Sequence, residues 1–146
     1  MPITLRDATP GDWPAIETLL ATNHLPTAGF QDSVSAAVVA CDGIEIVGVA
    51  GLEVYADGAL LRSVAVAEAA RGQGLGQALT RRAVAIAKTR QLGDVFLLTT
   101  TAEAFFPRLG FDRIERSSVP ASVQQSIEFR GACPASAVAM RAHIDA

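Results

Sequence analysis

The stretch VAVAEAARGQGLGQAL, residues 64–79, decides how the chain folds, because it joins a strand-like run to a helical run through a glycine-rich turn. Gly72, Gly74 and Gly76 stand at alternate positions, and Arg71 precedes them. Glycines before a helix let the backbone approach a ligand closely, and the first N–H groups of the helix then point at that ligand. Such a turn suits a pyrophosphate. For the glycines alone, a turn without any ligand is an equally good interpretation.

Two common nucleotide-binding motifs do not fit this turn. A P-loop requires Gly-Lys-Ser/Thr, which is missing, and the spacing Gly72-x-Gly74-x-Gly76 differs from the G-x-G-x-x-G of dinucleotide-binding folds. The turn also follows a run of hairpin strands, whereas a dinucleotide fingerprint follows the opening strand of a βαβ unit. A phosphate-binding turn of another kind therefore remains the functional interpretation.

The composition sets limits on the class of protein. With 146 residues, half of them apolar, the chain is expected to form a single domain over residues 1–146. A net charge of −3 without a basic stripe argues against a nucleic-acid partner. No apolar run is long enough to span a membrane, and the N-terminus has no secretion signal, so we expect a soluble cytoplasmic protein. Cys41 and Cys133 lie far apart, which supports neither a disulfide scaffold nor a metal site.

Two Asp-Gly pairs predict a three-stranded antiparallel meander from Ala36 onward, because Asp-Gly between extended runs is the strongest short hairpin signal. The first pair is Asp42-Gly43 and the second is Asp57-Gly58. If Asp57 and Gly58 are the central residues of the second turn, Tyr55 lies opposite Leu60 and Glu53 lies opposite Arg62. Glu53 and Arg62 would then share one face of the sheet.

The other predicted elements give a mixed order of strands and helices, typical of an α+β or mixed α/β domain. Before the meander we expect a short strand over ITLRDA and a helix from about Trp13 to Thr22. After the glycines we expect a helix over LGQALTRRAVAIAKTR, a buried strand over DVFLLTT, a short helix closing at Gly110, a helix over VPASVQQSIEF with Ser118 as its cap, and a final strand over SAVAMRAHI. The segment from Leu25 to Ser35 has no clear pattern.

Arg71-x-x-Gly74-x-Gly76, after the extended run SVAV, resembles the acetyl-CoA motif of the GNAT acetyltransferase superfamily. That motif reads Arg or Gln, two residues, Gly, one residue, Gly or Ala. AEAFFPRLGF, from Ala102 to Phe111, is similar to the family signature Ala-x-x-x-Tyr-x-x-x-Gly-Phe. The order of elements agrees over most of the chain. The resemblance implies a mostly antiparallel twisted sheet of six to seven strands, splayed between strands four and five and flanked by about four helices.

A narrower resemblance is to the arsenic-resistance N-acetyltransferases, which are small single-domain members of the superfamily. It rests on five segments: TAGF, GVAGLEVY, ALLRSVAV, LLTTTAEAFF and CPASAVAM. Some relatives in that group acetylate the amino group of glutamate-like amino acids that carry arsenic or phosphorus. This resemblance implies a small-molecule amine as the acceptor.

The superfamily resemblance also implies which residues hold the cosubstrate, acetyl-CoA, with no metal. The strand through Val64, Ala65 and Val66 would offer backbone groups to the pantetheine arm. The turn would hold the pyrophosphate through Arg71, Gly72, Gln73, Gly74, Leu75 and Gly76, with Gln77 at its margin. Thr99 stands where many relatives carry an Asn that contacts the cofactor. Phe106 stands where many carry a Tyr that protonates the leaving thiolate, and a phenyl ring has no proton to give.

Several residues are candidates for the acceptor side of the site, and they include Glu68 and Glu103 as alternative bases and Ser63 as a further substrate contact. An amine acceptor must lose a proton before it attacks a thioester, and Glu53 is the candidate base. Arg62 matches a position that points into the acceptor site in several relatives, which suggests a bidentate contact with a substrate carboxylate. Tyr55, on the same face, is a candidate replacement acid, and Thr101 is a candidate substrate contact. The alternative is that Glu53 and Arg62 form a cross-strand ion pair with no substrate role, while Tyr55 only packs.

We therefore predict an N-acetyltransferase that acts on a small amine, in particular an amino acid, by direct attack on acetyl-CoA. Two other functions stay open from the sequence. The missing tyrosine fits a non-catalytic acyl-CoA-binding sensor, and an open acceptor groove formed by residues 25–35 would fit a protein or peptide N-terminal acetyltransferase. Related folds often dimerise, and the final strand could support a homodimer.

Overall fold

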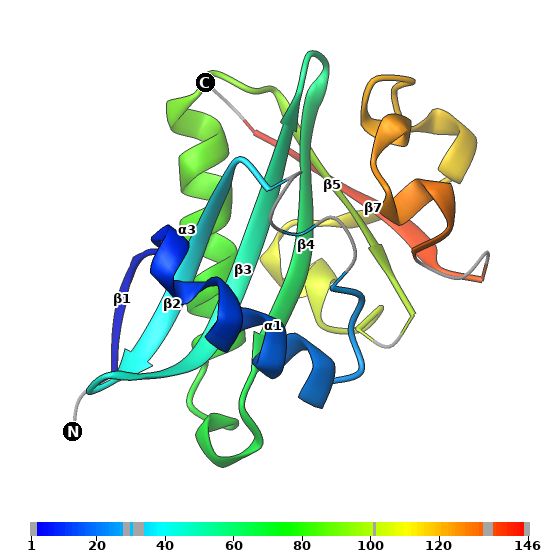
Figure 1. Cartoon of the computed structure of the whole chain (residues 1–146). Coiled ribbons are helices and arrows are strands. Elements are labelled where there is room, and N and C mark those ends of the chain that lie inside the picture. Colours follow the sequence, from blue (N-terminus) through cyan, green and yellow to red (C-terminus); the bar gives the residue numbers. More distant parts are fainter. Residues whose placement is uncertain (1–2, 28–29, 31–33, 101, 133–135, 145–146) are drawn as a thin grey trace.

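The computed structural model describes residues 3–27, 30, 34–100, 102–132 and 136–144, which form a seven-stranded sheet in the order β1-β2-β3-β4-β5-β7-β6 (Figure 1). The predicted mixed α/β fold with six to seven strands is confirmed. All pairs are antiparallel except β4 with β5. The strands are β1 (Ile3–Asp7), β2 (Ala36–Asp42), β3 (Glu45–Tyr55), β4 (Gly58–Val66), β5 (Asp94–Thr99), β6 (Asp112–Ile114) and β7 (Val138–His143).

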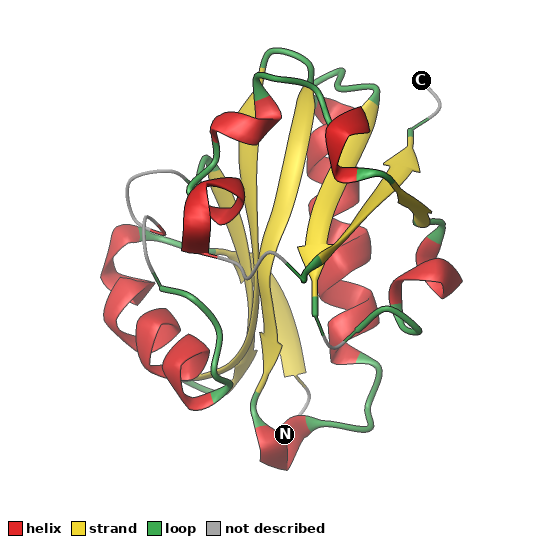
Figure 2. Ribbon diagram, turned by 90° about the vertical axis from the view of Figure 1, so that its right-hand side faces the viewer, coloured by secondary structure: helices red, strands yellow, loops and turns green. Residues whose placement is uncertain are grey.

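Helices cover both faces of the sheet (Figure 2). The predicted helix α1 (Trp13–Thr22) lies on one face, and α3 (Leu75–Thr89), which begins within the glycine turn, lies on the other. The segment 115–132 packs on the same face as α1, beside the far strands, through buried Val119 and Val123. Besides α1 and α3, the described residues contain short 3₁₀ turns and one five-residue π turn at Glu128–Ala132.

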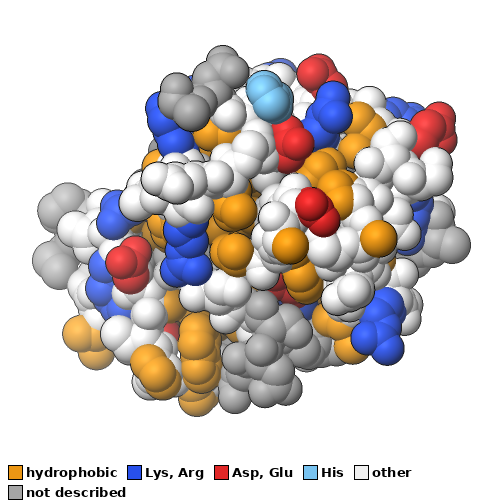
Figure 3. Space-filling model, turned by 90° about the horizontal axis from the view of Figure 1, so that it is seen from above, with side chains coloured by type: hydrophobic (Ala, Val, Ile, Leu, Met, Phe, Trp, Pro, Cys, Tyr) orange, Lys and Arg blue, Asp and Glu red, His pale blue; other side chains and the backbone are white. Residues whose placement is uncertain are grey.

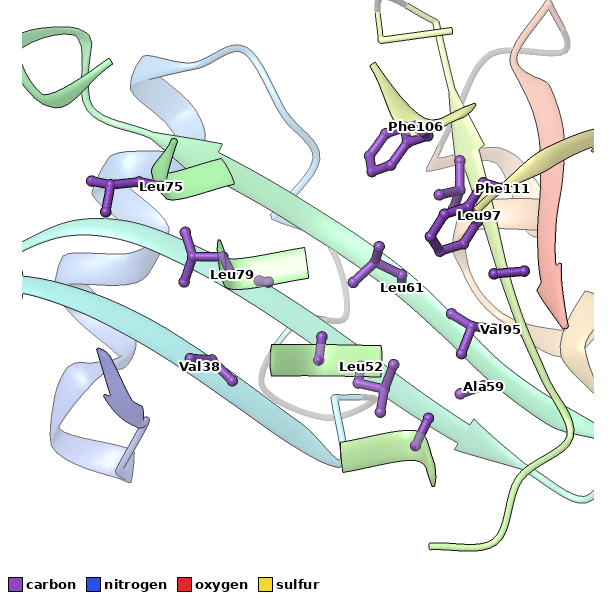
Figure 4. Packing of buried hydrophobic residues seen from close by; sticks show 14 of the residues in the cluster. Val38, Leu52, Ala59, Leu61, Leu75, Leu79, Val95, Leu97, Phe106 and Phe111 are labelled. Carbon is purple, nitrogen blue, oxygen red and sulfur yellow. The ribbon is translucent and has the colours of Figure 1, made fainter. Parts of the chain in front are cut away.

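The main core lies between α3 and the sheet. Leu75, Leu79, Ala83 and Ala87 recur every four residues, so they form one stripe along the helix, and all four are buried. They pack on residues of the central strands, including Val38, Leu52, Leu61, Val95 and Leu97 (Figure 4). Phe106 and Phe111 continue this core beyond Leu97, which fixes the segment after β5 against the sheet.

The register of the β3–β4 hairpin differs from the prediction by two residues. Tyr55 pairs with Gly58, Glu53 with Leu60 and Gly51 with Arg62, so Ala56 and Asp57 form the turn. Gly58 belongs to the strand because a Cβ there would lie 2.9 Å from Phe96 Cε2 and 3.0 Å from the Asp94 carbonyl oxygen. A shift of two leaves every side chain on its predicted face, so Glu53 and Arg62 still share one face.

The first hairpin turn is displaced in a similar way. The predicted central residues were Asp42 and Gly43, whereas Asp42 pairs with Glu45 and the turn consists of Gly43 and Ile44. Gly43 has a φ of 64°, which a glycine adopts without strain. Both Asp-Gly signals therefore located a hairpin correctly and misplaced its centre by one residue.

The predicted splay between the fourth and fifth strands is confirmed. β4 and β5 pair only through Ala59 with Val95 and Leu60 with Phe96. Beyond these pairs, β4 contains an extra residue, because Gly51 pairs with Arg62 and Val49 pairs with Ala65. Ser63, in this bulge, has a φ of 60°, which is uncommon for a residue other than glycine. The bulge bends β4 at the point where the two strands part.

The single helix predicted over VPASVQQSIEF is wrong. The segment contains 3₁₀ turns at Arg116–Ser118 and Val123–Gln125, followed by a π turn at Glu128–Ala132. Ser118 ends the first of these turns and caps no helix. The side-chain amide of Gln124 donates hydrogen bonds to the carbonyls of Arg116 and Val119, so backbone groups that a helix would use are satisfied by a side chain. Strand β6 follows Phe111 and was not predicted, because three residues are too few to show a pattern.

On the face seen in Figure 3, acidic and basic side chains are interspersed and do not gather by sign. None of the helices in the described ranges is long and apolar enough to cross a membrane. The main irregularities of the sheet, the brief β4–β5 pairing and the bulge at Ser63, lie together where the sheet opens.

We predict that Gly58→Ala lowers the free energy of unfolding by about 1–3 kcal/mol, because the new methyl group would press on Phe96 and on a backbone carbonyl that cannot move freely. Gly93→Ala is the matched control, since a Cβ there meets no atom within 4 Å, and its effect should stay within about 0.5 kcal/mol. Urea unfolding followed by circular dichroism measures both. Equal losses in the two variants would contradict the assignment of Gly58 as a close-approach position.

Candidate active site

The opening between β4 and β5 contains a cavity of about 700 Å³. Its walls are β4 from Leu61 to Val66 and β5 from Leu97 to Thr99, and its ends are formed by the loop after α1, by Phe105 and Phe106, and by Glu128. The lining is mainly apolar, with a few polar groups, as in most small-molecule sites. The parting of two parallel neighbours at the centre of the sheet thus creates the main cavity.

A second cavity of about 200 Å³ lies at the glycine turn and adjoins the first. Val66, Arg71, Gly76 and Phe105 line both cavities, so they form one elongated site. Gly72 and Gly74 have φ values of 83° and 76°, and a Cβ on either would meet no atom within 4 Å. The turn therefore presents bare backbone at the N-terminus of α3, which fits the pyrophosphate of a nucleotide cofactor.

Most of the predicted cofactor residues lie together along this site. The larger cavity is lined by Val64, Ala65, Val66, Arg71, Gly76, Thr99 and Phe106, and the smaller one by Val66, Arg71, Gly72, Gly74, Leu75, Gly76 and Gln77. Gln73 lines neither cavity. The Thr99 hydroxyl accepts a hydrogen bond from the Ala102 amide at 3.0 Å, which holds the end of β5. Thr101 lies outside the described residues.

Arg71 connects the turn to two other elements. Its Nε donates to the Val66 carbonyl at 3.2 Å, and its Nη2 donates to Asn23 Oδ1 at 2.6 Å. Asn23 follows α1, and its own amide nitrogen donates to the Leu19 carbonyl. Arg71 thereby fixes the loop after α1 against β4, which closes one side of the site.

A buried group of charged side chains lies at the other end of the larger cavity, on the face of α1. Arg62 and Glu53 are both fully buried at the side chain, and Arg62 Nη1 donates to Glu53 Oε2 at 2.9 Å. Arg62 Nε donates to Ser63 Oγ, and the guanidinium lies 5.7 Å from the ring centroid of Phe30. The predicted Glu53–Arg62 contact is therefore a diagonal ion pair between neighbouring strands.

The members of this group differ in their access to the cavity. Arg62 lines it, whereas Glu53 and Tyr55 do not. The Tyr55 hydroxyl donates to Glu53 Oε1, so protein groups already occupy both carboxylate oxygens of Glu53. Direct contact between Glu53 and an acceptor would require this group to rearrange, because the Glu53 side chain is fully buried and does not line the cavity. Substrate roles for these three residues, as predicted from the sequence, remain proposals.

Glu128 completes the group and was not found from the sequence. It begins the π turn, is 4% exposed, lines the cavity, and places its Oε2 3.8 Å from Arg62 Nη2. Glu128 is far from Arg62 in the sequence. It belongs to a segment predicted to be a regular helix, and no local motif marks it. Only the packing of that irregular segment across the sheet brings the two side chains together.

Phe106, the residue that stands in place of a tyrosine in the family signature, faces the larger cavity. It is 6% exposed, lines the larger cavity, and packs edge-on against Phe105 and Phe111 at centroid distances of 5.0 Å and 5.6 Å. Its ring can hold a ligand by packing, but it offers no acidic hydrogen. Within the described ranges, His, Cys, Asp and Glu side chains form no group of three that could hold a metal ion. Cys41 is buried in β2, and Cys133 lies outside those ranges.

Known proteins resemble this chain in both sequence and structure. The Acetyltransferase (GNAT) domain profile matches residues 33–113, which is more than half of the chain. An amino-acid acetyltransferase of Mycobacterium tuberculosis is 41% identical over 80 residues, or 54% of this chain and 45% of the relative. An uncharacterised N-acetyltransferase of Chlorobaculum tepidum is 35% identical over 63 residues, or 43% of this chain and 40% of the relative. The matched part therefore spans less than half of each of these curated relatives.

Solved structures extend the likeness to the whole fold. Rv2747 of Mycobacterium tuberculosis, solved in complex with CoA, superposes with a TM-score of 0.79 at 27% identity, over 97% of this chain and 99% of that one. N-acetylglutamate synthase of Neisseria gonorrhoeae, complexed with coenzyme A and N-acetyl-glutamate, gives 0.84 at 19% identity, over 100% of this chain and 36% of that one, which shows a shared fold. The chain belongs to the GNAT acetyltransferase family, and the predicted superfamily is confirmed.

We predict that Tyr55 titrates at a pH near 12, because burial and the hydrogen bond to Glu53 raise the pKa of its hydroxyl to about 12. Tyr55 is the only tyrosine, so the absorbance of phenolate at long ultraviolet wavelength reports it alone. The raised pKa means that Tyr55 stabilises the fold below about pH 10, and that this contribution is lost as the pH rises toward 12. The urea-unfolded chain, with a midpoint near 10, is the internal control. A midpoint near 10 in the folded protein would contradict the buried hydrogen bond.

Proposed function

We propose that this protein is an acetyl-CoA-dependent N-acetyltransferase whose acceptor is the amine of a small molecule of the amino-acid class, including glutamate-like analogues that carry arsenic or phosphorus. One observation carries the proposal. The gap between β4 and β5 joins a glycine turn with bare backbone at the N-terminus of α3 to a pocket that ends at buried charges. Family membership supports the reaction, and the amino-acid acetyltransferase of Mycobacterium tuberculosis supports the class of acceptor.

The cosubstrate would lie along the elongated site. Backbone groups from Gly72 to Gly76 would hold the pyrophosphate, with the N-terminus of α3 behind it. The strand from Val64 to Val66 would bind the pantetheine arm, with Phe106 packed against it. This orientation leads from the glycine turn toward Arg62, so the acceptor would occupy the charged end of the cavity.

The reaction would be a direct attack of the amine on the thioester carbonyl. Acetyl-CoA supplies an activated acyl group, and the protein must supply a neutral amine and hold it in line. Phe106 cannot protonate the leaving sulfur, so the proton released by the attacking nitrogen is the available source. The ion pair with Glu53, which lies outside the cavity, would hold Arg62 in place. The hydrogen bond from the Tyr55 hydroxyl would in turn restrain Glu53.

A second candidate function follows from the same phenylalanine. A protein that binds acyl-CoA without turnover needs no acid at position 106, and the side chain that lines the cavity there is a phenyl ring. Tight binding of acetyl-CoA, without CoA release across a broad panel of amines, would favour this sensor function. Residues 28, 29 and 31–33, which belong to the segment expected to separate a small-molecule site from a peptide groove, lie outside the described residues.

We predict that the purified protein releases CoA from acetyl-CoA when an amino acid is added. The panel should include glutamate, its phosphorus and arsenic analogues, simple alkylamines and an N-terminal peptide. Thiol detection measures the rate, and mass spectrometry should identify an N-acetylated product. Turnover with the peptide alone would instead indicate an N-terminal acetyltransferase, and no turnover with any amine would contradict the proposed function.

We predict that Gly76→Val weakens acetyl-CoA binding by at least about tenfold, because the isopropyl group would enter the channel where the two cavities meet. A single Cβ at this position already lies 3.5 Å from Phe105. Ala85→Val is the matched control, since it places the same side chain on the exposed face of α3. Calorimetric titration with acetyl-CoA measures both dissociation constants. Equal affinities would show that the cosubstrate binds elsewhere.

A further inference from the structure

Among the described residues at the end of the cavity, the buried ion pairs join one positive charge to two carboxylates. Arg62 carries one positive charge and faces two carboxylates, Glu53 at 2.9 Å and Glu128 at 3.8 Å. Tyr55 stays protonated well above neutral pH because burial and Glu53 raise its pKa to about 12. Ser63 is neutral. With both carboxylates ionised, this group has a net charge of −1 and is complementary to a cation.

The two carboxylates have different surroundings. Glu53 accepts hydrogen bonds at both oxygens and has no contact with the cavity. Glu128 lines the cavity and comes from a short irregular turn, and its distance to Arg62 is longer than a hydrogen bond. Glu53 therefore forms its ion pair with Arg62 outside the cavity, whereas Glu128 is the acidic side chain that lines the cavity and that the acceptor can reach.

We propose that Glu128 is the catalytic carboxylate of the acceptor site, a role that rests on the proposed function. Glu128 binds the ammonium group of the acceptor and takes one proton from it, which gives the neutral amine. The amine nitrogen then forms a bond to the thioester carbon, and the carbon–sulfur bond breaks. The second nitrogen proton passes to the CoA sulfur, and Glu128 releases its proton to solvent. The sum is ammonium plus acetyl-CoA giving acetamide, CoA thiol and one proton.

This assignment makes Arg62 and Glu53 positioning residues. Arg62 donates hydrogen bonds to Glu53, to Ser63 and to the Pro26 carbonyl, so protein groups surround its guanidinium on several sides. An acceptor carboxylate at Arg62 would have to compete with Glu128 for the same guanidinium. Recognition at this end of the cavity is therefore by the positive charge of the amine, and any carboxylate of the acceptor binds elsewhere in the cavity.

The test is the pH dependence of CoA release by Glu128→Gln with the best acceptor from the panel. At pH 7 we expect kcat to fall by at least about 100-fold, the usual size of a general-base contribution. The deficit should shrink as the pH approaches the pKa of the acceptor, because the amine then loses its proton without help. Among the described residues, the other charged or titratable side chains that line this cavity are Arg62, His24 and Arg71. Glu53 and Tyr55 connect to Arg62 outside it, and the Glu128→Gln variant keeps all five. Affinity for acetyl-CoA should stay within twofold.

Two further variants separate this role from a structural one. Glu115→Gln removes the same charge from an exposed position in the same segment and should leave kcat and its pH profile unchanged. Glu128→Asp keeps a carboxylate and should retain the wild-type shape of the pH profile at a lower rate. A deficit in Glu128→Gln that is constant from pH 7 to pH 9.5, or one that Glu128→Asp shares in size and shape, would overturn the proposal. Wild-type protein without activity on any amine would instead refute the proposed function itself.

Discussion

The site depends on how briefly β4 and β5 pair. Two parallel residue pairs hold these strands together, and the bulge at Ser63 then bends β4 away from its neighbour. A longer ladder would close the sheet and leave no cavity, whereas no ladder would separate the two halves of the core. On the face covered by α3, hydrophobic packing replaces the missing hydrogen bonds between β4 and β5. Leu61 of β4 belongs to the same buried cluster as Val95 and Leu97 of β5. The opening is thus an interruption of hydrogen bonding within a continuous hydrophobic layer.

The buried arginine is tolerated because each neighbour offsets part of its desolvation. Removal of a guanidinium and a carboxylate from water costs several kcal/mol, and the pair recovers this only with good geometry and further hydrogen bonds. Arg62 has Glu53, Ser63, the Pro26 carbonyl and the Phe30 ring around it, and Tyr55 satisfies the remaining oxygen of Glu53. Such a group resists rearrangement, so it can hold a pocket side chain such as Glu128 in a fixed position.

Much of the fold could be predicted because its signals are local. The glycine turn, the hairpins and the stripe of α3 depend on residues close together in sequence, and the family motif adds the splay between β4 and β5. The hairpin register could not be fixed in this way, since Phe96 and the Asp94 carbonyl, on another strand, leave no room for a side chain at position 58. The irregular segment that carries Glu128 was mistaken for a helix, because the side-chain amide of Gln124 supplies bonds that no propensity scale includes. A cavity residue such as Glu128, which irregular packing brings into place, was therefore beyond sequence reasoning.

The turn between β3 and β4 is also tied to that irregular segment. Ser122 Oγ donates to the Asp57 carboxylate at 2.8 Å and accepts from the Asp57 amide at 3.3 Å, while Arg116 Nη1 donates to the Ala137 carbonyl. Residues 115–132 thus rest on the sheet through a few polar attachments and the side chains of Val119 and Val123, without pairing to any strand. A segment attached in this way can change its sequence and path while the glycine turn and the central strands stay intact. If the proposed function holds, the architecture separates two evolutionary problems, since one part of the chain would conserve the use of a common acyl donor while another explores new acceptors.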